Sequence, residues 1–258
     1  MGVIRVTYYT DPACPKSWAA EPAFARLEME FPDQLAITFV MGGFAREIGP
    51  GPEVAVAALD AAATSGMPVD ARGWLVGAPR SSFPACIAVK AAAEQGLDGP
   101  YLRVLREGFM VDRRSLDTPE ALIEAAQGAP GLDVARFAND VRSNATVEAF
   151  GADLERTRAL LGPEPTLPAV EVEGTLVEQL SPQGLADAVR AAGGEARELP
   201  GPDAVLAHGV RRATPEVAAA SGLPRPRAAA ALWAAALEFR VVPQAIAGGG
   251  VLWSAAAS

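Results

Sequence analysis

The stretch that decides the fold is "DPACPKSWAAEP", residues 11–22. It follows "GVIRVTYY", a segment rich in β-branched and tyrosine side chains that predicts a strand over residues 3–9. From Pro15 onward the apolar residues recur at helical intervals, and proline suits the first turn of a helix, where a missing N–H costs no hydrogen bond. The sequence therefore predicts a cysteine, Cys14, at the junction where a strand passes into a helix.

The segments that follow predict an α/β protein. Pro22 is expected to kink the first helix, and "LAITFVM", residues 35–41, predicts a second strand apolar enough for the centre of a sheet. A mainly helical block then runs from about residue 53 to residue 162. Within it, Ser81 and Ser82 are candidates to cap one helix, and Thr118 before Pro119 to cap another.

Strands return after the helical block. Residues 169–173 and 176–180 predict a hairpin around Gly174-Thr175, and "SPQGLADAVRAAGG" then predicts a short capped helix. The order is thus β-α-β, a helical block, then β-β-α, which we assign to a first domain of residues 1–194.

The last part of the chain differs in composition. A polar linker, residues 195–203, precedes a segment that predicts a helix, a turn at Gly222, a second helix and a hairpin. We expect residues 205–258 to form a separate winged-helix-like module. Its five arginines and two glutamates give it a charge of 5 − 2 = +3, against 22 − 31 = −9 for the whole chain.

Composition excludes several classes of protein. The net charge of −9 argues against a protein that coats nucleic acid. No apolar run approaches the ~20 residues of a membrane-spanning helix, and the first residues lack the pattern of a secretory signal. Two cysteines cannot form a disulfide framework, which fits a reducing compartment, so a cytoplasmic protein is expected.

The order of elements, with Cys-Pro at the first strand-to-helix junction, resembles the thioredoxin fold in its DsbA-like form. More narrowly, "DPACPKSWAAEP" with "GGF" after the second strand is similar to the FrnE-like cytoplasmic branch, described as predicted dithiol–disulfide oxidoreductases and related to a Clp-protease adaptor group. The "SSFPACIAVKAAAEQG" segment also fits the helical insert of that branch, and the similarity covers about residues 3–193. The resemblance implies a thioredoxin-like fold and thiol–disulfide exchange.

Two residues depart from the pattern of that family. The second active-site cysteine is Ser17 here, and the usual aromatic residue before it is Lys16. Cys14 is expected at the amino end of a helix, where free N–H groups favour a thiolate, and the Lys16 charge and Ser17 hydroxyl add to this effect. We therefore expect a lowered pKa for Cys14 and a nucleophilic thiol.

A serine hydroxyl is too weakly acidic to resolve a mixed disulfide, so the motif predicts monothiol chemistry with glutathione or another small thiol. Cys86 is the one internal alternative as a resolving thiol, if the helical insert brings it to Cys14. The preferred interpretation of Cys86 is a small buried hydrophobe on an alanine-rich helix, because free cysteines are among the most buried residues. A catalytically quiet adaptor that binds other proteins is the second hypothesis for the whole domain.

The resemblance also implies a cis-proline opposite Cys14, beside which substrate backbone pairs. Pro168, preceded by Leu167, is the first choice because it comes just before a strand, and Pro165 is the competitor. Trp18 and Phe44 are expected to line or support this substrate groove, though both also suit a core.

The C-terminal module offers two interpretations. A recognition helix needs polar side chains aimed at base edges, but the second helix carries Arg225 and Arg227 and then mostly alanine. We therefore favour packing, dimerisation or partner docking over a DNA-linked redox regulator. The lone histidine, His208, has no cysteine or carboxylate cluster near it in the sequence, and no metal site is predicted.

Overall fold

The computed structural model describes residues 2–49, 51–207 and 209–256. His208, interpreted above as a surface residue, lies outside the described residues. The first strands and helices are β1 (Ile4–Thr10), α1 (Pro15–Ala19), α2 (Glu21–Glu30) and β2 (Leu35–Met41). The helical block holds α3 (Glu53–Ser65), α4 (Arg72–Leu75), α5 (Phe83–Ala93), α6 (Asp98–Met110), α7 (Pro119–Ala126), α8 (Val134–Asp140) and α9 (Asn144–Leu161). Then follow β3 (Ala169–Val172), β4 (Thr175–Leu176) and α10 (Pro182–Ala191).

A mixed four-stranded sheet organises these elements, with the order β2-β1-β3-β4. β1 pairs in parallel with β2, so that Thr10 lies opposite Met41, and antiparallel with β3, so that Tyr8 lies opposite Val170. The prediction that residues 35–41 form a central strand is wrong. β2 is an edge strand and its Ile37 is 36% exposed, whereas Val40 and Met41 at its end are buried in the clusters beside Cys14 and in the helical block.

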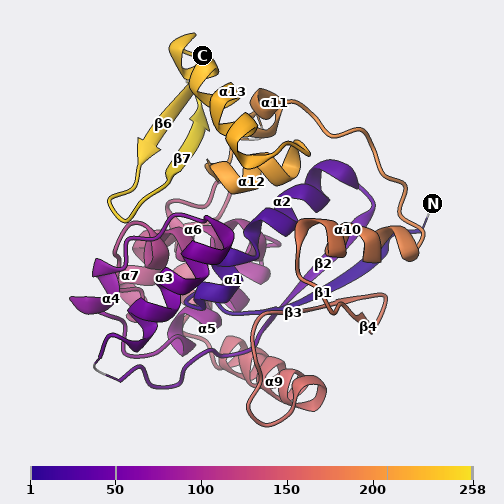
Figure 1. The fold of residues 1–258 in the computed structure, drawn as a ribbon. Coiled ribbons are helices and arrows are strands. Elements are labelled where there is room, and N and C mark those ends of the chain that lie inside the picture. Colours follow the sequence, from indigo (N-terminus) through magenta and orange to yellow (C-terminus); the bar gives the residue numbers. More distant parts are fainter. Residues whose placement is uncertain (1, 50, 208, 257–258) are drawn as a thin grey trace.

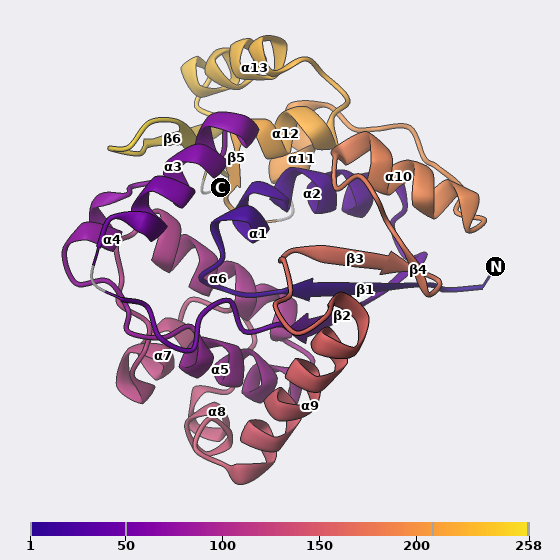
Figure 2. The ribbon, with the colours of Figure 1, turned by 60° about the horizontal axis from the view of Figure 1, so that its bottom comes forward.

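Helices cover both faces of the sheet. Figure 2 shows the sheet nearly edge-on, with α2 and α10 on one side and α5 and α9 on the other. On the first side an apolar cluster joins β1 and β3 to the two helices: Ile4, Val6, Tyr8, Ala23, Leu27, Phe31, Val170, Val172, Leu185, Ala186 and Val189. The fold is thus thioredoxin-like, with a large helical insertion of the DsbA-like kind.

Local details refine three sequence predictions. The helix begun at Pro15 breaks at Ala20, and Pro22 lies in the first turn of α2 rather than at a kink. The hairpin turn is Glu173-Gly174, both with positive φ, one residue earlier than expected, because a tight turn uses the left-handed region there. Thr118 caps α7 through the N–H of Ala121, as predicted.

Ser82 occupies the position that precedes α5, but its hydroxyl makes no cap. It donates to Asp11 Oδ2 at 2.7 Å instead, while Ser81 Oγ accepts from the N–H of Phe83. The sequence prediction of a serine cap therefore holds for Ser81 and fails for Ser82, because the Asp11 carboxylate competes for its hydroxyl.

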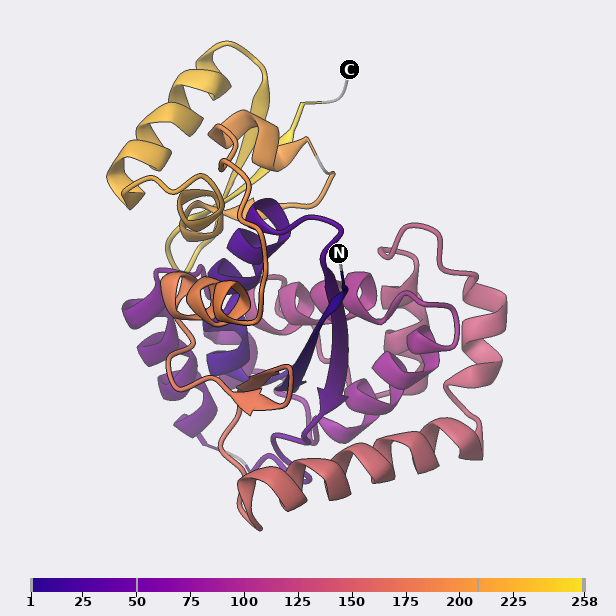
Figure 3. The same cartoon turned by 90° about the vertical axis from the view of Figure 1, so that its right-hand side faces the viewer.

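The C-terminal module contains α11 (Pro202–Leu206), β5 (Arg212–Ala213), α12 (Thr214–Ala220), α13 (Arg225–Leu237), β6 (Val241–Ala245) and β7 (Val251–Ala255). Its strands form a three-stranded sheet in the order β5-β7-β6. The helix-turn-helix and hairpin were predicted, whereas α11 and β5 were not, since both are very short. Figures 1 and 3 show the module stacked on α2, on the side of that helix away from the main sheet.

Within the described part of the chain, no helix is both long enough and apolar enough to cross a membrane.

Candidate functional site

Cys14 lies at the junction between β1 and α1, directly before the first residue of α1. It is the N-cap residue of α1, with extended backbone angles (φ −76°, ψ 118°). Its sulfur lies 3.9 Å from the carbonyl oxygen of Leu167, to which the thiol donates. The peptide bond between Leu167 and Pro168 is cis, so the choice of Pro168 over Pro165 is confirmed. The structure therefore brings together Cys14, Leu167 and Pro168, as the family resemblance implied.

The thiol of Cys14 is covered. Only 2% of the residue is exposed, and it packs in an apolar cluster with Tyr9, Val40, Leu167, Ala169 and the partly buried Leu161. The side chain of Leu167, which is 6% exposed, belongs to this cover rather than to an open groove. An incoming reagent reaches the sulfur only when this cover shifts.

Burial raises the pKa of Cys14, so the expectation of a lowered pKa is wrong. Burial is the largest influence because an apolar surrounding penalises the thiolate. The Ser17 hydroxyl and the N–H groups of Ser17 and Lys16 act in the opposite direction, as a helix start should, while the Asp11 charge raises the pKa further. In this conformation the helix start does not outweigh desolvation.

Ser17 contributes to the site as the sequence suggested, whereas Lys16 contributes differently. Ser17 is fully buried, and its hydroxyl, which has no other partner among the described residues, favours the thiolate. Lys16 acts on the sulfur through its backbone N–H, while the residue itself is exposed and borders a groove. Its ammonium group is therefore available to a ligand rather than committed to Cys14.

Asp11 is a site residue that sequence reasoning missed. It is fully buried, and its carboxylate accepts the N–H groups of Ala13 at 2.7 Å and Phe44 at 2.6 Å. It also accepts from the Ser82 hydroxyl and, at 3.1 Å, from the Cys86 thiol. The signal in the sequence was an aspartate directly after a strand. At that position a side chain lies at the edge of the sheet, where loops from distant parts of the chain meet.

Cys86 faces this carboxylate. Burial and the nearby Asp11 charge raise its pKa well above the usual value. Cys86 is fully buried in the apolar cluster of the helical block, whereas Cys14 belongs to the cluster beside Leu167, and both thiols are free in the described chain. The interpretation of Cys86 as a resolving thiol gains no support from this placement, and it remains a prediction.

A groove of about 570 Å³ runs beside Pro168. Its lining comes from α1 and α2, the end of α3, the segment before α10 and the C-terminal module: Lys16, Ala19, Ala20, Pro22, Thr64, Ser65, Pro168, Leu180, Ser181, Pro182, Pro215, Ala218, Ala219 and Arg225. Lys16 and Arg225 are the charged side chains among these described residues, and both are cationic. The groove therefore favours an acidic ligand or segment.

Trp18 and Phe44 do not line this groove. Trp18 is 1% exposed, its indole N–H donates to the Pro68 carbonyl at 2.9 Å, and Arg103 lies over its ring at 4.8 Å. It is a core residue on the buried face of α1. Phe44 is 36% exposed and contacts the site through its backbone N–H to Asp11. Of the two, only Phe44 contributes to the site, and it does so without its ring.

The C-terminal module exposes apolar side chains around the end of α13. Trp233 (50% exposed) and Leu237 (81%) lie one helical turn apart on α13 and form an apolar patch. Phe239 (86%) and Val242 (51%) are exposed in the segment that follows. Apolar patches of this kind mark interaction surfaces. In the described residues, no group of three or more histidine, cysteine or acidic side chains could hold a metal ion.

Known proteins resemble this chain both in sequence and in fold. A protein-family model described as thioredoxin matches residues 8–170. The chain is 30% identical over 169 residues to the ClpXP adapter protein SpxH of Halalkalibacterium halodurans, a match that covers 61% of this chain and 55% of that protein. Identity to SpxH of Shouchella clausii is 27% over 168 residues, covering 61% and 54%.

Among solved structures, the cytosolic disulfide reductase DsbM from Pseudomonas aeruginosa, determined with GSH, matches with a TM-score of 0.60 and 21% identity. That match covers 73% of this chain and 98% of the other. The likeness establishes a shared fold. The chain spans about half the length of the curated relatives it matches.

Proposed function

The chain belongs to the thioredoxin family, and from that premise we propose that it is a thiol–disulfide oxidoreductase of monothiol type with Cys14 as its exchanging thiol. The observation that carries the proposal is the position of the Cys14 sulfur at the start of α1, against the carbonyl that precedes cis-Pro168. Within the family we assign it to the FrnE-like branch, with a DsbA-like domain of residues 1–194.

The proposed reaction uses one protein thiol and an external one. The Cys14 thiolate attacks one sulfur of a disulfide; the S–S bond breaks, a bond from Cys14 to that sulfur forms, and the other sulfur leaves as a thiolate. Glutathione or another small thiol then attacks the mixed disulfide and releases Cys14. The Ser17 hydroxyl cannot take this second role, since it is a very weak acid.

The apolar cover sets the conditions for this exchange. Because burial raises the pKa of Cys14, the thiolate fraction at neutral pH is low while the cover is closed. The proposal therefore requires that a partner bound in the groove displaces Leu167 from the sulfur. Lys16 and Arg225 at the groove suit a partner that carries carboxylates, such as glutathione or an acidic segment.

Mass spectrometry of the intact protein tests the proposal. After incubation with glutathione disulfide at pH 8, we expect one glutathionyl adduct on the unchanged protein and on Cys86→Ser, and none on Cys14→Ser. Added glutathione should remove the adduct. Circular dichroism of each variant verifies that the fold persists. If the unchanged protein stays unmodified while its unfolded form is modified on both cysteines, the thiol is inert and the proposal fails.

A second candidate function is a catalytically quiet adaptor. Two observations favour it: the covered thiol with its raised pKa, and the apolar patch at Trp233 and Leu237. The SpxH proteins that match over about half their length are named ClpXP adapters. In this role the C-terminal module, residues 205–258, docks a partner protein or a second copy of the chain.

The patch variant Leu237→Glu tests the adaptor role. If the patch docks a second copy, light scattering should give a dimer for the unchanged protein and a monomer for Leu237→Glu, with Leu176→Glu as an exposed control outside the patch. If the patch docks a ClpX-type partner, the same variant should weaken pull-down of that partner at least tenfold. Wild-type behaviour of Leu237→Glu in both measurements would remove this candidate.

The winged-helix-like order of the C-terminal elements also keeps a DNA-linked regulator open as a third hypothesis. It has the weakest support, because exposed Trp233 and Leu237 on α13 suit a protein surface better than base edges. Duplex binding that rises steeply as salt is lowered, and that is lost in Arg227→Ala, would favour it.

A further inference from the structure

The groove beside Pro168 carries a charge opposite in sign to that of the whole chain. The net charge of the chain is −9, yet the described lining of the groove contains no aspartate or glutamate. Most arginines and lysines of this protein form salt bridges. Lys16 and Arg225 are both exposed at the groove and form none within the described chain. The groove therefore presents two cations to a ligand.

Arg225 comes from the C-terminal module, where it is the first residue of α13. A cation at this end of a helix is opposed by the helix dipole, and the first turn of α13 contains no acidic side chain. The guanidinium lies instead against Gly66, the C-cap of α3, so closely that a side chain at Gly66 would collide with Nη1. The negative end of the α3 dipole thus holds the guanidinium at the groove.

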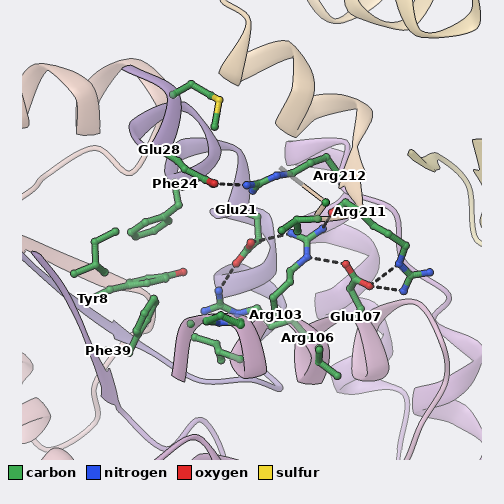
Figure 4. A pocket seen from close by; sticks show the side chains of 18 of the residues that line it. Tyr8, Glu21, Phe24, Glu28, Phe39, Arg103, Arg106, Glu107, Arg211 and Arg212 are labelled. Carbon is green, nitrogen blue, oxygen red and sulfur yellow. Dashed lines mark hydrogen bonds and ion pairs between the residues drawn. The ribbon is translucent and has the colours of Figure 1, made fainter. Parts of the chain in front are cut away.

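The module that carries Arg225 is fixed to the rest of the molecule. Figure 4 shows ion pairs that join α2 and α6 to the segment before α12, among them Glu28 with Arg212 and Glu107 with Arg211. A buried apolar cluster also joins α2 to the module: Ala25, Met29, Val205, Leu206, Val217, Ala220, Leu232, Ala235, Val241 and Trp253. Because the start of α2 lines the groove, this packing also fixes where Arg225 stands along it.

The other walls suit a small ligand. Lys16 follows Cys14 by two residues, and Pro168 is the cis-proline beside the Cys14 sulfur. The lining between them is made of small, apolar and hydroxyl side chains, and α10 begins at the groove, where its free N–H groups add positive potential. A volume of about 570 Å³ lies within the range of small-molecule sites, roughly 300–1,000 Å³.

We propose that the C-terminal module is part of the thiol site, and that Arg225 binds a carboxylate of small disulfides that carry one on each half. This inference rests on the function proposed for Cys14. Arg225 and Lys16 pair with the two carboxylates. The Cys14 thiolate forms a bond to one sulfur, the S–S bond breaks, and the other half leaves as a carboxylate-bearing thiolate. Arg225 contacts only the carboxylate, so it determines which disulfide reacts and leaves the reactivity of the sulfur unchanged.

Three disulfides of similar size test this selectivity in the Cys86→Ser background. 3,3′-Dithiodipropionate carries two carboxylates, bis(2-hydroxyethyl) disulfide is neutral, and cystamine carries two ammonium groups. The rate of adduct formation at Cys14 is measured by intact mass at pH 8. It is divided by the rate of the same disulfide with 2-mercaptoethanol, which removes differences in intrinsic reactivity. We expect the dicarboxylate to react at least about threefold faster than the neutral disulfide, and cystamine to be slowest.

Three variants assign the preference to Arg225. Arg225→Gln should lower the preference for the dicarboxylate at least about twofold without changing the rate of the neutral disulfide. Arg225→Lys keeps the cation and should keep the preference. Arg227→Gln removes an exposed arginine of the same helix that is outside the described lining, and should have no effect. High salt should weaken the preference in the unchanged protein, which a purely structural role of Arg225 would not explain.

A thioether analogue tests the site without exchange. By calorimetric titration, 3,3′-thiodipropionate should bind the unchanged protein at one site, and more weakly after Arg225→Gln. If no disulfide reacts while this analogue still binds through Arg225, the function proposed for Cys14 fails and the carboxylate site stands. Equal normalised rates for the dicarboxylate and the neutral disulfide overturn the inference and leave exchange at Cys14 intact. Absence of analogue binding, or equal affinity in Arg225→Gln, overturns it as well.

Discussion

Cys14 and Glu21 stand seven positions apart at the ends of one segment, and both are buried, yet their acid–base behaviour is opposite. The pKa of Cys14 is raised by burial, which outweighs the opposing effects of Ser17 and Lys16. Burial alone would also raise the pKa of Glu21, but the Arg106 and Arg103 guanidiniums more than offset it and hold that pKa below its usual range. The two pKa shifts differ in direction because Glu21 has two arginine side chains fixed beside it, whereas Cys14 has no cationic side chain at its sulfur among the described residues.

A helix start stabilises a buried anion less than fixed cationic side chains do. Partial charges of free N–H groups, with a hydroxyl beside them, do not compensate for a fully apolar cover. Two guanidiniums held at contact distance do. A cation at the Cys14 sulfur would change its behaviour, but the ammonium of Lys16 is exposed at the groove instead.

The largest expected effect is a loss of stability when one cationic partner of Glu21 is removed. Arg103→Met would leave three glutamates without this cation, one of them the fully buried Glu216. Breaking a buried pair from one side costs about 3–5 kcal/mol in the free energy of unfolding, which urea denaturation would measure. The matched control is Arg5→Met, which removes an exposed pair with Glu173 and should cost far less, because solvent screens that pair. Similar losses in the two variants would contradict the argument.

The next largest expected effect is on how the free energy of unfolding depends on pH. Because the folded-state pKa of Glu21 lies below its ordinary value of 4.5, its stabilising contribution is complete above that pH and is lost as pH falls through the folded pKa. Glu21→Gln should cost about 2 kcal/mol at pH 7. That cost should shrink as pH falls below about 4.5, when the unchanged protein also loses the charge. A cost that is the same at pH 3 and pH 7 would show that charge is not the cause.

Ser17 offers a way to change the Cys14 side of the comparison. Ser17→Cys restores a Cys-x-x-Cys pair, whose second thiol can attack the mixed disulfide. We expect the glutathionyl adduct at Cys14 to disappear at least ~10-fold faster than in the unchanged protein, followed by intact-mass measurement over time. Ser17→Ala is the control, and its adduct should persist. An adduct equally long-lived in Ser17→Cys would mean that position 17 cannot reach the bound sulfur.

The smallest expected effect separates the two cysteines. The Asp11 charge raises the pKa of both, more prominently for Cys86, which donates to it, than for Cys14. Asp11→Asn should therefore speed iodoacetamide labelling at pH 8 a few-fold at either thiol, more for Cys86. Labelling is measured in Cys14→Ser and Cys86→Ser backgrounds, with circular dichroism to verify folding. A larger gain at Cys14 would reverse this ranking of causes.

Much of the site was predictable from local pattern. The strand-to-helix junction at Cys14 and the proline before the β3 hairpin follow from short-range preferences, together with the family resemblance that pointed to Pro168. Asp11 was not foreseen, because its four donors come from segments up to 75 residues away, such as that of Cys86. The covered state of the thiol depends in the same way on Leu161 and Leu167, which are distant in sequence.

The sequence by itself determined the order of strands and helices, the absence of a second cysteine at position 17, and a C-terminal module of helices and a hairpin, since periodicity, turn residues and residue identity are local. The tertiary structure decided the position of β2 at the sheet edge, the raised pKa of Cys14 and the ion-pair network that joins α2 and α6 to the C-terminal module. Solvation and Coulomb energy depend on what the whole chain brings within a few ångströms of a group, and no local pattern specifies that.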